Sequence, residues 1–320
     1  MRKILKVAAW LLGLVLLIVA GVAGWIHFTP PPVYDAPAIP ELQVEATPER
    51  VAQGLKIASM QCIICHKGSD GKLSGQLIRD APKAFGKFYS PNITQHPDKG
   101  IGKWTDGELY YFLRTGLRAN GKYASPAMPK FINAADEDLY SVIAWLRSDD
   151  ERLQPSEQSS RPQELSFLSK ALLKFVFKPF ELPSQAINLP DTTQTVAWGR
   201  YLANNLYTCF ACHSADFATN NDLDPEKSQG FYGGGNPMLD MEGRVVPSAN
   251  ITPDASTGIG NWTEEQFVQT VKYGKRPDGT LIRYPMLPHT PLTDNEVKAI
   301  YAYLRTVPAV NNKIDRPSFE

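Results

Sequence analysis

TCFACHSAD, residues 208–216, places two cysteines and a histidine within five positions, and MQCIICHKGSD, residues 60–70, repeats the pattern. These two stretches contain all four cysteines of the chain. A Cys-x-x-Cys pair alone occurs in redox dithiols, in zinc sites and in disulfides, so the cysteine spacing does not choose among them. The histidine that directly follows each pair distinguishes between these kinds of site.

Cys-x-x-Cys-His is the attachment signature of c-type haem. Two thiols at this spacing lie on one helical face and can form thioethers to the two vinyl groups, and the next histidine then reaches the iron. A zinc site would need both pairs to converge, but they lie 147 residues apart and each brings its own histidine. The sequence therefore predicts two covalently bound haem c groups. The attachment cysteines and proximal histidines of this prediction are Cys62, Cys65, His66, Cys209, Cys212 and His213.

The chain repeats itself around these motifs. Residues 90–121, SPNITQHPDKGIGKWTDGELYYFLRTGLRANG, align without a gap with residues 248–279, SANITPDASTGIGNWTEEQFVQTVKYGKRPDG, at an offset of 158. Upstream, Gly54 and Gly199 occupy matching places before the two cysteine pairs. The second copy carries an additional glycine-rich GFYGGGNPM. A repeat of this length predicts one domain duplicated, not two unrelated domains.

The repeat also nominates the second axial ligand of each iron. Among the six methionines, only Met128 and Met286 are related by the offset of 158, and both lie beside proline before the last helix of their copy. Methionine is a usual axial ligand in cytochromes c, whereas core packing is the ordinary role of a loop methionine. Two matched methionines favour ligation. The competing candidates are His96, His289, Met60, Met238 and Met241.

Helix signals dominate both copies. Thr47 and Pro48 mark the start of a helix that leads into the first cysteine, and Thr105 with Glu108 marks a second start. A third helix has its apolar residues on one face, at Leu139, Val142, Ile143 and Leu146. No alternating strand pattern of useful length is present. We expect an all-α fold with long loops between short helices.

VAAWLLGLVLLIVAGVAGWI, residues 7–26, is uncharged and long enough to span a bilayer as a helix. Arg2, Lys3 and Lys6 precede it, which predicts a cytoplasmic N-terminus. A cleaved secretory signal is the alternative, but the apolar core of a signal usually has only about 7–15 residues. We expect a retained single-pass anchor in the bacterial cytoplasmic membrane, with the bulk of the protein in the periplasm.

These signals divide the chain into five parts. We expect an N-terminal membrane anchor at 1–28, a proline-rich spacer at 29–46 that stands the domains off the membrane, a first domain at 47–150, a linker at 151–190 and a second domain at 191–320.

Within the linker, ELSFLSKALLKFVFKPFELP, residues 164–183, repeats a lysine every four residues among apolar side chains. This segment fits an amphipathic helix on the membrane or against a partner subunit. We favour the other interpretation, an inter-domain connector buried against both domains.

With these motifs in order, the chain resembles class I c-type cytochromes. More narrowly, it resembles the cytochrome c subunits of membrane-bound bacterial dehydrogenases for alcohols, gluconate and related substrates. NIT…GIGKW at 92–104, NITPDASTGIGNW at 250–262 and the haem and methionine motifs carry this resemblance, which covers roughly residues 45–310. It implies two tandem class I cytochrome c domains.

The repeated segments also offer contacts to the haem propionates. Trp104 and Trp262 could point an indole N–H at a propionate, and Arg118 and Arg276 could pair with propionates. Ordinary packing and solvated arginines are the alternative roles.

Two function classes fit these motifs. The first is an electron-transfer protein of a respiratory chain, which accepts electrons from a dehydrogenase or quinol-oxidising complex and passes them to a terminal oxidase or another cytochrome. The second is a dihaem enzyme such as a peroxidase or a thiosulfate-oxidising dehydrogenase, which needs an open iron position and acid–base groups. Two matched methionines favour electron transfer, with no catalytic residue. The balanced charge, 33 basic and 33 acidic residues, implies no polyanionic partner such as nucleic acid.

Overall fold

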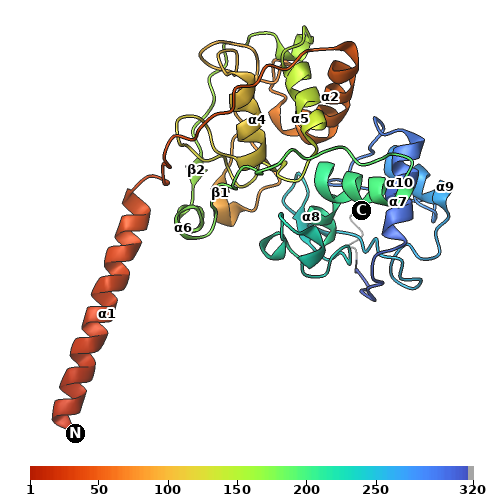
Figure 1. Ribbon diagram of the computed structural model, residues 1–320. Helices are drawn as coiled ribbons and strands as arrows, with labels where there is room; N and C mark the ends of the chain where they lie inside the picture. The colour runs from red at the N-terminus through yellow and green to blue at the C-terminus, as the bar shows by residue number, and fades with distance from the viewer. Residues whose placement is uncertain (316–320) are drawn as a thin grey trace.

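A long N-terminal helix stands apart from a head made of two helical units (Figure 1). The computed structural model describes residues 1–315. The helices are, in chain order, α1 (Arg2–Phe28), α2 (Pro48–Gln61), α3 (Ile63–His66), α4 (Asp106–Thr115), α5 (Asp136–Leu146), α6 (Phe167–Phe175), α7 (Thr195–Arg200), α8 (Cys209–His213), α9 (Glu264–Tyr273) and α10 (Asp294–Leu304). Short helical turns are η1 (Lys83–Phe85), η2 (Glu151–Leu153), η3 (Tyr201–Leu206), η4 (Phe217–Thr219) and η5 (Pro225–Lys227).

The duplication is visible in the helix bounds. Helices α4 and α9, and likewise α5 and α10, begin and end at positions related by the offset of 158. Thr105 closes a capping box with Glu108 at the start of α4, as predicted, and Thr263 does the same with Gln266 at the start of α9. Local sequence therefore specifies both helix starts in the same way.

In each unit the first helix crosses the last one closely, α2 over α5 and α7 over α10. The predicted apolar face of α5 is buried, with Leu139 and Ile143 at most 1% exposed. Buried side chains from both units form one continuous cluster. The prediction of a mostly helical fold is thus confirmed, and the two units share a core.

Two short strand pairs depart from the predicted absence of strands. Strand β1 (Gly86–Lys87) pairs antiparallel with β2 (Glu164–Leu165), with Gly86 opposite Leu165. Strand β3 (Pro237–Leu239) pairs antiparallel with β4 (Val245–Pro247) inside the longer loop of the second copy. Segments of two or three residues are too short to show an alternating pattern, so the sequence offers no periodicity to detect.

The proline-rich segment 29–46 does not form a free spacer. Its backbone is extended, as expected, but it runs along the first unit (Figure 1). The Tyr34 amide donates to the Gly121 carbonyl at 2.9 Å, and the Val44 amide donates to Asp106 Oδ2 at 2.9 Å. The segment is therefore docked on the first unit and is not a freely extended linker.

The linker helix α6 is also placed differently from our expectation of a buried connector. It packs against α1, η1 and β2. Leu173 is buried, but Phe175 is 58% exposed and Phe167 is 47% exposed. Much of its apolar surface therefore remains outside the core.

Candidate haem sites

Each Cys-x-x-Cys-His motif lies on or beside a short helix, α3 in the first unit and α8 in the second. None of the four cysteines forms a disulfide. Burial raises the pKa of Cys62 and Cys209 to about 12. Burial also raises the pKa of Cys65 and Cys212 to about 11. Reactive dithiols have a lowered thiol pKa, so these motifs do not have the electrostatics of a redox dithiol.

The two motifs do not join into one zinc site. Over residues 1–315, no three His, Cys, Asp or Glu side chains are grouped closely enough to hold a metal ion. Each motif stays with its own histidine, as the haem interpretation requires.

The motif histidines are oriented in the same way in both units. Nδ1 of His66 lies 2.8 Å from the Pro91 carbonyl oxygen, and Nδ1 of His213 lies 2.9 Å from that of Ala249. Pro91 and Ala249 are themselves related by the repeat offset. A carbonyl only accepts, so each Nδ1 must carry the proton and Nε2 must carry the lone pair. This is the arrangement by which a backbone carbonyl fixes the tautomer and orientation of a metal-binding histidine.

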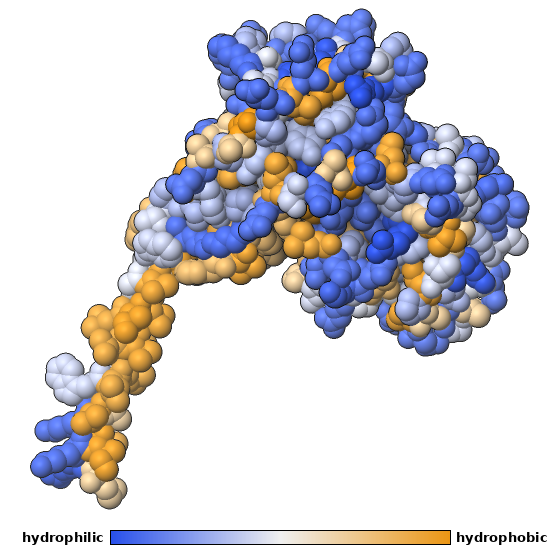
Figure 2. Space-filling model, in the orientation of Figure 1, coloured by the Kyte–Doolittle hydropathy of each residue, from blue (hydrophilic) through white to orange (hydrophobic). Residues whose placement is uncertain are grey.

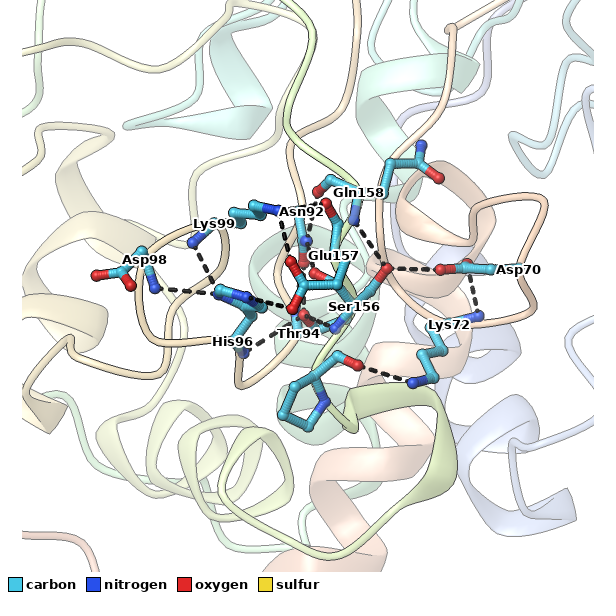
Figure 3. A network of polar contacts seen from close by, with 11 residues as sticks. Asp70, Lys72, Asn92, Thr94, His96, Asp98, Lys99, Ser156, Glu157 and Gln158 are labelled. Carbon is cyan, nitrogen blue, oxygen red and sulfur yellow. Dashed lines mark hydrogen bonds and ion pairs between the residues drawn. The ribbon is translucent and has the colours of Figure 1, made fainter.

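The Asn-x-Thr triplets hold these carbonyls in place. Oδ1 of Asn92 accepts from the Thr94 amide at 2.9 Å and from its hydroxyl at 2.7 Å, and Asn250 makes the same pair of contacts with Thr252 at 3.0 and 2.7 Å. Figure 3 shows the first triplet inside a polar network, in which Nδ2 of Asn92 donates to the Gln158 carbonyl. Each turn therefore secures the residue directly before it, which orients the histidine. Sequence analysis found these triplets but not this role.

His96 is not placed as an iron ligand. Its Nδ1 accepts from the amides of Asp98 and Lys99, both at 3.1 Å, and its Nε2 lies 3.2 Å from Glu157 (Figure 3). Both ring nitrogens are therefore engaged in the polar network near the surface.

Met128 and Met286 occupy matching turns before α5 and α10. Both are half-buried, and Met128 packs against the same core as Cys62 and Trp104. His289, the rival candidate in the second unit, is also half-buried, and burial lowers its pKa. Among the other methionines, Met241 is 47% exposed.

The two predicted arginines differ in their surroundings. The Arg118 guanidinium lies over the rings of Trp104 and Phe112, at 5.9 and 5.7 Å from their centroids. Its Nε is buried with no hydrogen-bond partner, and burial lowers its pKa. Arg276 instead reaches Asp278 at 3.4 Å. A buried donor without a partner is costly, so Arg118 fits a site that receives an anionic group.

These observations together fit haem c in both units. The donor set supplies two cysteine thiols and a histidine whose Nε2 carries the lone pair. The first unit adds Arg118, a half-buried cation whose Nε has no partner. Each unit therefore offers the residues that would hold one covalently bound haem c.

Asp80 joins the two units. The Tyr284 hydroxyl, two residues before Met286, donates to Asp80 Oδ2 at 2.6 Å across the boundary between the units. Burial is the main cause that raises the pKa of Cys65 and of Cys212, and the negative charge of Asp80 raises both pKa values further. The Asp80 carboxylate of the first unit therefore acts electrostatically on one cysteine of each motif.

Further polar contacts join the two units. Lys56 forms a 2.6 Å ion pair with Glu296, which is almost fully buried. The Tyr201 hydroxyl donates to the Asp138 carboxylate and accepts from the Ala135 amide at 3.0 Å. These buried polar contacts hold the two units in one arrangement.

Comparison with known proteins gives a match for each unit. Residues 49–146 match the family model of the cytochrome c oxidase, cbb3-type, subunit III, and residues 197–308 match that of cytochrome c. A diheme cytochrome c-type protein of Cereibacter sphaeroides is 30% identical over 312 residues, which are 93% of this chain and 97% of that protein.

Cytochrome subunits of dehydrogenases are similar as well. The fructose dehydrogenase cytochrome subunit of Gluconobacter japonicus is 31% identical over 264 residues, 78% of this chain and 50% of that protein. The alcohol dehydrogenase (quinone) cytochrome c subunit of Gluconacetobacter polyoxogenes is 29% identical over 278 residues, 81% of this chain and 56% of that protein. The chain thus spans about half the length of these two relatives.

Proposed function

The chain belongs to the dihaem c-type cytochromes, and we propose that it is a membrane-anchored electron carrier made of two tandem class I domains. The first domain covers residues 47–150 and the second covers 191–320, of which 316–320 lie outside the described residues. The anchor at 1–28 crosses the bacterial cytoplasmic membrane once, and the head lies in the periplasm.

The proposed iron ligands are His66 with Met128 and His213 with Met286. Cys62, Cys65, Cys209 and Cys212 hold the two haems covalently, and Arg118, Arg276, Trp104 and Trp262 contact their propionates. When bound, haem supplies a one-electron couple. The chain itself supplies attachment, ligand orientation and burial.

One observation carries this proposal. Two matched motifs present their histidines on equivalent backbone carbonyls, and they belong to units that are joined by buried polar contacts. A carrier that passes electrons between two haems needs both sites to be held rigidly. A dihaem enzyme would instead need an open position with acid–base groups around it.

The anchor is supported by length and composition. Over residues 1–315, α1 is the one helix that is long and apolar enough to cross a membrane. Its 27 residues span about 40 Å at 1.5 Å per residue, compared with about 30 Å for the hydrocarbon core of a bilayer. Figure 2 shows its apolar surface exposed along its length, with hydrophilic residues at its free end.

The proposal includes the electron donor and the electron acceptor. A dehydrogenase or a quinol-oxidising complex is the donor, and a terminal oxidase or another cytochrome is the acceptor. The printed names of the relatives, cytochrome subunits of fructose and alcohol dehydrogenases, support the first of these.

A reoxidation experiment tests the proposal. The reduced full-length protein is mixed with respiratory membranes of its host, and haem oxidation is followed by absorbance, with membrane-free and cyanide-treated samples as controls. We expect oxidation that depends on the membranes, and negligible turnover of peroxide or thiosulfate by the protein alone. Robust turnover of either compound would show that the protein is a dihaem enzyme and would contradict the proposed role as an electron carrier.

A further inference from the structure

Helix α6 carries an apolar stripe on its exposed side. Leu168 and Phe175, seven residues apart and hence on the same helical face, are 43% and 58% exposed, and Val176 at the end of the helix is 60% exposed. On the opposite side, Ser169 and Leu173 are buried at 4% and 8%. The helix therefore rests on the head by one face and presents a second apolar face outward.

The same helix is fastened to the end of α1. Lys170 Nζ donates to the His27 carbonyl at 2.6 Å, and Lys174 Nζ donates to the Pro30 carbonyl at 2.8 Å. Lys174 also lies over the Trp25 ring, 4.4 Å from its centroid. Cations at a helix C-terminus satisfy its last carbonyl groups and interact favourably with its dipole. These lysines are thus directed at the end of α1.

An aromatic contact places the end of α6 beside the end of α1. The rings of Trp25 and Phe175 lie 5.9 Å apart between centroids. Tryptophan near the end of a membrane-spanning helix is typical of the interface between lipid and water. Phe175 lies beside Trp25, so the end of α6 lies level with the end of α1. In Figure 2 the apolar surface of α1 continues onto the underside of the head, where α1 meets it.

We infer that α6 lies on the outer surface of the lipid bilayer, with Leu168, Phe175 and Val176 inserted at the level of the headgroups. This inference rests on the proposed function, in which α1 crosses the membrane. A short amphipathic helix binds such a surface through its buried apolar area. Its continuity with α1 identifies lipid as the occupant of the exposed face.

The consequence is a fixed orientation of the head. The head is joined to α1 through α6 and also through the docked segment 29–46, which contacts Gly121 and Asp106. With the apolar face of α6 in the lipid surface, the two haem sites stay at a constant height and angle above the membrane. Electron partners embedded in the same membrane would then meet one defined side of the head.

Lipid-phase labelling tests the inference. The full-length protein with both haems is reconstituted into phosphatidylcholine vesicles, labelled with a bilayer-soluble diazirine reagent and mapped by mass spectrometry. We expect label on α1 and on Phe167, Leu168, Phe175 and Val176. Label on α1 without label on α6 would overturn the inference and leave the anchor intact. Label on neither helix would overturn the anchor itself.

A second arm separates apolar insertion from charge attraction. The lysines of α6 are directed at α1, so labelling should be the same with and without phosphatidylglycerol. Labelling of α6 that requires the anionic lipid would mean that lysine–headgroup attraction brings α6 to the surface, which contradicts the proposal.

Variants provide the matched control. Leu168→Glu with Phe175→Glu should lose label on α6 and keep it on α1, with an unchanged haem spectrum as the check on folding. The control variant is Leu223→Glu with Leu281→Glu, two exposed residues of the second unit at 63% and 66%. This variant should keep the label on α1 and on α6. If the first variant loses its haem spectrum, the milder variant Leu168→Ser with Phe175→Ser is tested in its place. Persistent label at Phe167 and Val176 in a folded variant would overturn the inference.

Discussion

Each motif histidine is held by a backbone carbonyl, from Pro91 in the first unit and Ala249 in the second. The carbonyl is in turn secured by the Asn-x-Thr turn that follows it. A neutral carbonyl orients the ring without adding a negative charge beside it. This contact therefore presents Nε2 as a neutral ligand, and the axial partner and the nearby charges are left to set the redox properties.

The methionine assignments lead to the first prediction at this scale. Met128→Ala and Met286→Ala should each convert one of the two haems to high spin and lower its potential, because thioether ligation favours the ferrous iron. Absorption spectra and potentiometric titration measure both effects. Met241→Ala is the control, since that side chain is 47% exposed, and it should leave both haems unchanged.

His289 provides the opposing outcome. If His289→Ala altered the spectrum of the second haem while Met286→Ala did not, the ligand assignment in that unit would be wrong. The first unit has no such rival at the matching position, and His96 is engaged elsewhere.

Among the helices, the recurrent element is the close crossing of the first and last helix in each unit. A Cβ atom added to Gly54 would lie 1.9 Å from the carbonyl oxygen of Ser141 in α5, and one added to Gly199 would lie 1.8 Å from that of Ala299 in α10. Ser141 and Ala299 are related by the offset of 158. The two glycines are therefore required by backbone contact, which explains why both copies carry them.

Gly54→Ala should accordingly destabilise the head. Alanine is a better helix former than glycine by about 1 kcal/mol, but here the clash is with backbone that cannot swing away, and overpacking costs typically about 1–3 kcal/mol. We expect a net loss of unfolding free energy, measured as a lower midpoint of thermal unfolding in detergent. Gly13→Ala in α1, with nothing within 4 Å of the added Cβ, should leave the midpoint unchanged. A higher midpoint for Gly54→Ala would contradict the crossing geometry.

Over the whole molecule, the decisive feature is the shared boundary between the two units. The buried cluster is continuous across it, and the ion pair of Lys56 with Glu296 and the bond of Tyr284 to Asp80 cross it. Because the Asp80 charge raises the pKa of a cysteine in both motifs, we expect this single charge to act on both sites.

Asp80→Asn should raise the reduction potentials of both haems together. Removing a negative charge disfavours the more positive, ferric state, by on the order of 1 kcal/mol for a charge near a protein surface. Asparagine still accepts from the Tyr284 hydroxyl, so the boundary should persist. Potentiometric titration measures the change. The control is Asp98→Asn, because Asp98 is 68% exposed and paired with Lys103, and it should shift neither potential. A shift at one haem alone would show that the Asp80 charge does not act on both sites.

Much of the protein could be predicted from local sequence. The cysteine–histidine motifs, the cap of α4 at Thr105 and the apolar face of α5 each depend on residues within a few positions of one another. The repeat predicted the second axial ligands, because two copies at one offset single out Met128 and Met286. Such features are readable because short-range geometry is set by the helix period and by covalent spacing.

Tertiary structure decided what joins distant residues. No sequence pattern marks Pro91 or Ala249 as the partner of a histidine, because every residue carries a carbonyl. The bond from Tyr284 to Asp80 spans 204 positions, and that from Lys174 to Pro30 spans 144. The sequence by itself determined two haem motifs, their duplicated helices and an apolar N-terminal helix. Only the folded chain decided that Tyr284 bonds to Asp80 across the two units and that α6 lies at the end of α1, because long-range contacts arise from packing that no local period encodes.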